Sequence, residues 1–158
     1  MTDAPPSLRL PAPVAWVLAL GSLALAAHGF TTGRQLAPAS LGYPGVAATF
    51  LFLLLARLRR LTPAEVARLG TWLLYGGGAA VAVGLGGGVW GLARGTFQVP
   101  ALVLTVLGCP LLAVASLRLS TAKEGGRGFQ GAAVAFLLVA GGGTLELVKQ
   151  WSSLGLPG

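Results

Sequence analysis

The stretch LLYGGGAAVAVGLGGGVWGLARG, residues 73–95, decides the class of fold because it is both strongly apolar and rich in glycine. Glycine occupies nine of its positions. In water each interior glycine costs a helix about 1 kcal/mol relative to alanine. In a bilayer the backbone has no alternative hydrogen-bond partner, and an unmade bond costs several kcal/mol. The stretch is therefore predicted to form a transmembrane helix whose glycines allow another backbone to approach closely.

The composition of the whole chain agrees with a membrane protein. Of its 158 residues 54% are hydrophobic and only 9% are charged, with a mean hydropathy of +0.79. A soluble domain carries about 25% charged residues. We expect a single transmembrane domain over residues 1–158, with short mobile tails at 1–10 and 152–158. The single cysteine, Cys109, excludes an intrachain disulfide and a cysteine-based metal cage, and we interpret it as inert packing.

Five apolar segments follow one another along the chain. They cover residues 13–30, 43–58, 69–92, 99–117 and 129–151. A transmembrane helix needs about 20 apolar residues, with a range of about 17 to 25. The predicted fold is therefore all-α, a polytopic transmembrane helical bundle of five spans, of which 43–58 is the shortest. Ala24-Leu25-Ala26 resembles a signal-peptide cleavage site, but we expect 13–30 to be a retained helix. Pro110 is expected to kink the fourth helix.

The positions of the basic residues test the number of spans. If all five segments cross, eight basic residues share one side and three share the other. The larger group is Arg9, Arg57, Arg59, Arg60, Arg68, Arg118, Lys123 and Arg127, and the smaller is Arg34, Arg94 and Lys149. Cytoplasmic loops carry the excess of Lys and Arg. The N-terminus is therefore predicted to be cytoplasmic and the C-terminus external.

Two seams of small residues run along the helix expected at 69–92. Gly76, Ala80, Gly84 and Gly88 repeat every four residues, the spacing of right-handed GxxxG crossings. Gly77, Ala80, Gly84, Gly87 and Gly91 step by three and four, as in left-handed packing. These residues are predicted to pack helices together, and the helix is expected to lie centrally. Gly141-Gly142-Gly143 is the expected facing surface, unless the seams meet another subunit or a lipid or cofactor cavity.

Polar residues in the external half form a second group of candidates. Glu146 and Lys149 share a helix face and are expected to form an ion pair near the membrane interface. An intramembrane carboxylate can alternatively bind a proton or cation. His28, the only histidine, is a candidate ligand for haem, a pigment or a quinone, or an ordinary interfacial side chain. With Arg34, Arg94 and Gln98 these residues would make a polar pocket for an ion or an anionic substrate if they converged.

Basic residues gather after the second segment, at Arg57, Arg59 and Arg60. The cluster is first a determinant of topology. It is also a candidate site for anionic lipid, at about 1 kcal/mol per basic residue near the membrane surface. The net charge of +7 does not indicate nucleic-acid binding, because the basic residues are scattered between apolar runs.

The functional hypothesis that follows is a non-catalytic integral membrane protein of the bacterial inner membrane. The motifs HExxH, CxxC, Walker A and GxSxG are missing from the sequence, and no acidic cluster suits a metal. The excess of small residues favours a structural or accessory subunit that packs against other membrane subunits, or a homo-oligomer. One alternative is a small proton-coupled transporter using Glu146 and His28. A second is a haem-, pigment- or quinone-binding subunit using His28.

Overall fold

The computed structural model describes residues 10–32, 41–62, 64, 71–95, 99–122 and 126–153, and every structural statement below refers to these residues. They form five helices and no strand: α1 (Ala12–Thr31), α2 (Gly42–Leu58), α4 (Thr71–Arg94), α5 (Val99–Ala122) and α6 (Arg127–Ser153). The all-helical bundle is confirmed. The expected tails lie almost entirely outside the described residues, except that α6 continues to Ser153.

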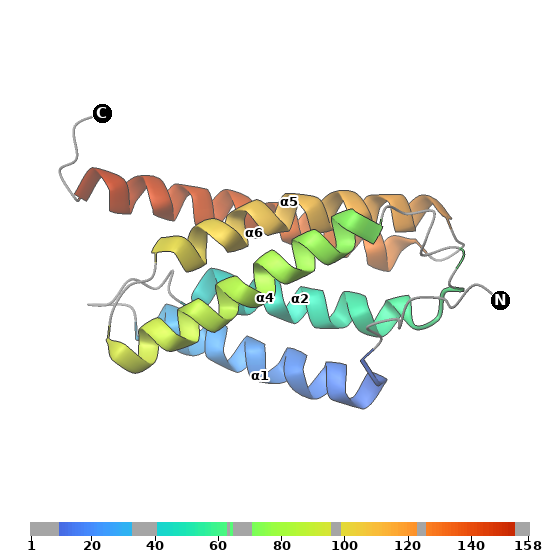
Figure 1. Ribbon diagram of the computed structural model, residues 1–158, viewed down its shortest axis with the longest axis horizontal. Coiled ribbons are helices and arrows are strands. Elements are labelled where there is room, and N and C mark those ends of the chain that lie inside the picture. The colour runs from blue at the N-terminus through green and yellow to red at the C-terminus, as the bar shows by residue number, and fades with distance from the viewer. Residues whose placement is uncertain are drawn as a thin grey trace.

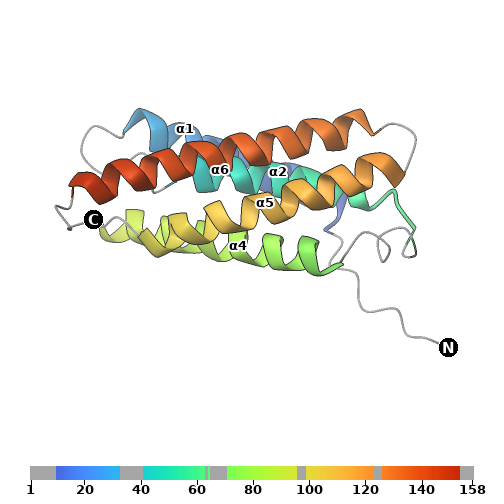
Figure 2. The same ribbon diagram turned by 90° about the horizontal axis from the view of Figure 1, so that it is seen from above.

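The helices lie side by side, and successive helices run in opposite directions (Figures 1 and 2). Four of them, α1, α4, α5 and α6, contain segments long and apolar enough to cross a membrane. The fifth, α2, has 17 residues. At 1.5 Å per residue it is about 26 Å long, slightly less than a hydrocarbon core of about 30 Å. The α5 helix continues through Pro110 without interruption.

The centre of the bundle is formed by α2 and α5. The short helix α2 contacts α1, α4, α5 and α6, and α5 contacts α2, α4 and α6. Between them lies the apolar core, which includes Leu54, Val81, Leu112 and Phe136. The expectation that the glycine-rich helix is central is therefore not met. Instead, α4 packs on α5 and α2 with one face and leaves the opposite face exposed.

One seam of α4 faces α5. A Cβ added to Gly77 would lie 2.9 Å from the Gly108 carbonyl oxygen, and one added to Gly87 would lie 2.9 Å from the Ala101 Cβ. Gly84 faces Thr105 in the same way. In contrast, Gly76 has no neighbouring atom within 4 Å of its Cβ position. The buried positions of α4 recur at alternating steps of three and four, at Leu74, Gly77, Val81, Gly84, Gly88 and Gly91.

The glycines of α6 face other partners than expected. A Cβ on Gly142 would meet the ring of Tyr43 from α2, and one on Gly143 would meet the Val106 side chain from α5. Gly141 faces open space. The surface that receives the α4 seam is therefore α5, and two of the three α6 glycines, Gly142 and Gly143, accommodate α2 and α5.

A second seam of small residues joins α1 to α2. The buried residues of α1 are Ala15, Ala19, Ser22, Ala26 and Gly29. Across the interface, the Cβ position of Gly45 lies 2.9 Å from the Ala26 Cβ and from the Ser22 carbonyl oxygen. The hydroxyl of Thr49 shares its hydrogen between the Gly45 carbonyl oxygen of its own helix, at 2.9 Å, and the Ala19 carbonyl oxygen of α1, at 3.3 Å. The interface thus combines close backbone approach with a hydrogen bond between helices.

Candidate functional site

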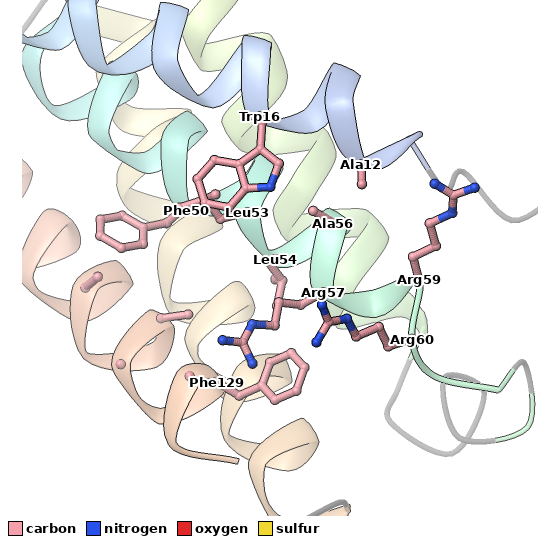
Figure 3. Close-up of a pocket in the computed structure, with 14 residues that line it drawn as sticks. Ala12, Trp16, Phe50, Leu53, Leu54, Ala56, Arg57, Arg59, Arg60 and Phe129 are labelled. Carbon is pink, nitrogen blue, oxygen red and sulfur yellow. The ribbon is translucent and has the colours of Figure 1, made fainter. Parts of the chain in front are cut away.

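A groove lies at one end of the bundle (Figure 3). The start of α1, the end of α2 and the start of α6 form its walls. Its volume is about 820 Å³. Ligand pockets in proteins occupy about 300–1,000 Å³, so the groove has room for a ligand of ordinary size.

Three arginines lie at the end of the groove that is nearest the end of the bundle. Arg57 belongs to the last turn of α2, and Arg59 and Arg60 follow that helix directly. Their charges are favoured near the C-terminus of α2, where the helix dipole is negative. Figure 3 shows Arg57 turned toward α6 and Arg59 turned toward the start of α1. The charges of Arg57 and Arg59 therefore lie on different sides of the mouth of the groove.

The guanidinium of Arg57 lies against the backbone of α6. Its Cζ atom is 2.9 Å from the position that a Cβ on Gly128 would occupy. The absence of a side chain at Gly128 makes this contact possible. Gly128 is the second residue of α6, and the first turn of that helix contains no acidic residue. A cation is thus held beside the positive end of a helix dipole.

The remainder of the groove is apolar. Trp16 from α1 lines it, as do Phe50, Leu53 and Leu54 from α2. On α6 the lining residues Gly131, Ala132 and Ala135 are small. No atom lies within 4 Å of the Cβ position of Gly131, so the groove is open there. The site therefore has a cationic mouth and an apolar interior.

The sequence predicted the arginines of this site but not its walls. The proposed lipid cluster Arg57, Arg59 and Arg60 is brought together at the groove. The contributions of Trp16 and of Gly128–Ala135 depend on how α1 and α6 lie beside α2. The glycines at 128 and 131 are a signal for a close approach on this side of α6, but the sequence does not say what approaches.

The polar residues at the opposite end of the bundle do not converge in the described structure. His28 lies on the exposed side of α1. The guanidinium Cζ of Arg94 lies 4.3 Å from the centre of the Trp90 ring, a cation–π contact on α4 itself. Arg34 and Gln98 lie outside the described residues, so their part in the expected polar pocket is not described.

The expected ion pair on α6 is replaced by a hydrogen bond. Gln150 Nε2 donates to Glu146 Oε1 at 3.2 Å, whereas Lys149 is exposed. Gln150 lies one turn beyond Glu146 on the same helix face. No hydrogen bond or ion pair joins any two of His28, Arg94, Glu146 and Lys149.

Within the described residues there is no group of three or more His, Cys, Asp or Glu side chains that could hold a metal ion. Cys109 is buried in α5, beside Pro110. Comparisons with protein-family models, with curated proteins and with solved structures find no match for this chain.

Proposed function

We propose that the chain is a non-catalytic integral membrane protein, a small accessory subunit that packs against another membrane protein through the outward face of α4. In this proposal all five helices cross the bilayer, with the N-terminus in the cytoplasm and the C-terminus outside. The excess of basic residues at the end that holds Arg57, Arg59 and Arg60 supports this orientation. A bacterial inner membrane is the corresponding location.

The crossing of α2 is supported by the arrangement of its neighbours. The last residues of α1 and the first residues of α4 lie at opposite ends of the bundle (Figure 1). If α1 and α4 both cross, the chain between them must return across the membrane. The described helix that runs in the required direction is α2. Its short length is compatible with a span because α2 packs against four other helices, which cover much of its apolar surface.

The observation that carries the accessory role is the surface of α4 that faces away from α5. Gly76 and Gly86 have no atom within 4 Å of their Cβ positions, and Ala79 and Ala82 between them are exposed. Small residues at such a surface let the backbone of another transmembrane helix approach closely.

Large aromatic side chains lie beside this small-residue face. Trp72 at the start of α4 is 88% exposed, and Trp90 near its end is 54% exposed. Aromatic side chains at both ends of a shallow, small-residue face offer contact area to a helix that lies along it. We expect the partner to be a transmembrane helix with its own small residues at the contact.

The test is photo-crosslinking in the native membrane, with the crosslinking amino acid placed at Ala79. The same amino acid at Gly141 serves as the control, because it is exposed on a different helix. We expect a discrete product with a different membrane protein from position 79 and none from position 141. The double variant Gly76→Leu, Gly86→Leu should abolish that product without unfolding the chain, because both positions are open. A monodisperse monomer with no crosslink at position 79, or a product made only of two copies of this chain, would contradict the proposed role.

A further inference from the structure

We infer that the groove between α1, α2 and α6 binds one anionic phospholipid, with the phosphate at the arginines and an acyl chain along the apolar interior. This inference requires only that the bundle lies in a bilayer, and it does not depend on a protein partner at α4. The ligand has a charged headgroup and an apolar chain, and the groove has a cationic mouth and an apolar interior to match them.

The apolar region follows the direction that an acyl chain takes in a bilayer. The groove extends along α2 from Arg57 to Phe50 and along α6 from Gly128 to Ala135. Each of these distances is about 10 Å along a helix. One leaflet of the hydrocarbon core is about 15 Å thick. An acyl chain whose phosphate sits at Arg57 would therefore lie in the groove for about two-thirds of its leaflet.

The charge at the mouth of the groove selects an anionic headgroup. The Arg57 guanidinium and the N-terminal end of α6 are in contact and are both positive. An anion placed beside them would interact favourably with both at once. An arginine can also donate two parallel hydrogen bonds to the oxygens of one phosphate. The five-span arrangement assigns eight basic residues and the acidic Asp3, Glu65 and Glu124 to this side of the membrane, so an excess of positive charge remains whichever of them pair.

The apolar lining of the groove suits an acyl chain. Trp16 on α1 and Phe50 on α2 contribute aromatic walls, and the opposite wall on α6 is made of Gly131, Ala132 and Ala135. The volume of about 820 Å³ between these walls accommodates an acyl chain.

Native mass spectrometry of the intact purified chain tests the inference. The chain is titrated with phosphatidylglycerol and, separately, with phosphatidylcholine that has the same acyl chains. We expect one phosphatidylglycerol molecule to remain bound at concentrations at which phosphatidylcholine dissociates. Arg57→Gln should weaken phosphatidylglycerol binding about fivefold. Arg118→Gln removes an exposed charge outside the groove, near the end of α5, and should leave the binding unchanged.

A second pair of variants tests the apolar region without changing any charge. Gly131→Leu would place a side chain in the open part of the groove and should remove the bound lipid. Gly141→Leu, on the same helix and equally open but outside the groove, should not. Circular dichroism and gel filtration establish that both variants fold.

Three results would overturn the inference. The first is equal retention of the two lipids by the unaltered chain. The second is an equal loss of binding in Arg57→Gln and Arg118→Gln, which would indicate a diffuse surface charge. The third is full binding by folded Gly131→Leu. Inorganic phosphate provides a further check, because displacement of the lipid by millimolar phosphate alone would mean that the acyl chain makes no contribution to binding.

Discussion

Single glycines determine how closely α4 approaches α5. The Cβ position of Gly84 is occupied by the Thr105 hydroxyl and by the Ala101 carbonyl oxygen. Thr105 is itself fully buried, and its hydroxyl donates to the Ala101 carbonyl oxygen at 2.9 Å. The polar group is thus satisfied within α5, and Gly84 provides the room for it. A larger residue at position 84 would separate the helices.

Replacement of this glycine is expected to destabilise the fold. Gly84→Leu should lower the free energy of unfolding in mixed micelles by about 1–3 kcal/mol, because the added side chain overfills a packed interface. Gly86→Leu, two residues away on the open side of α4, should be neutral or slightly stabilising, because leucine favours a helix over glycine. Equal effects of the two variants would show that α4 does not pack on α5 in this register.

Pairs of helices pack through rows of small residues, and the sequence shows the row on one helix more clearly than the surface that receives it. The alternating steps of three and four between small residues from Gly77 to Gly91 were visible in the sequence, but the helix that packs against them was not. The contact surface on α5 contains Ala101, Thr105 and Gly108, in a segment whose apolar residues lack an obvious one-sided pattern. The central position of α2 could not be predicted either, because in a membrane apolar residues face both lipid and protein.

The contact of α1 with α2 shows a signal that is present in the sequence but easily overlooked. The small residues of α1 recur at steps of four and three from Ala15 to Gly29, with exposed Val17, Leu20 and Leu23 between them. The spacing of small residues in α1 therefore predicts a helix-packing face, as it does in α4. What the sequence does not contain is the identity of the donor that crosses the interface, Thr49.

The hydrogen bond from Thr49 is expected to contribute measurably to the contact of α1 with α2. Thr49→Val keeps the shape of the side chain and removes both its bond to Ala19 and its bond to Gly45 within α2. It should lower the free energy of unfolding by about 0.6 kcal/mol. The matched control is Thr144→Val on α6, because the Thr144 hydroxyl bonds only to the Ala140 carbonyl oxygen of its own helix. Both free energies are measured in the same mixed micelles. A loss at Thr144 as large as that at Thr49 would mean that the bond between helices contributes nothing.

On the scale of the whole molecule the two ends of the bundle differ in charge and in shape. One end of the bundle holds Arg57, Arg59 and Arg60 around the groove. The last turns of α5, with Arg118, and the start of α6, with Arg127, lie at the same end (Figure 1). The other end holds Arg94 and Lys149 among the described residues. This asymmetry follows from the sequence once the number of spans is known. The groove could not be predicted, because it arises where α6, which is distant in sequence, lies beside the consecutive helices α1 and α2.

The central claim is that α2 crosses the membrane and places the arginine end in the cytoplasm. It is tested most directly by a membrane-impermeant maleimide and two cysteine variants that bracket α2. These are Thr32→Cys and Ala64→Cys, at exposed positions, in a chain in which the buried Cys109 is replaced by alanine. In intact cells the reagent should label position 32 alone, and position 64 should react only after the membrane is permeabilised. Labelling of both positions from the same side would contradict the five-span arrangement, and labelling of position 64 alone would contradict the orientation.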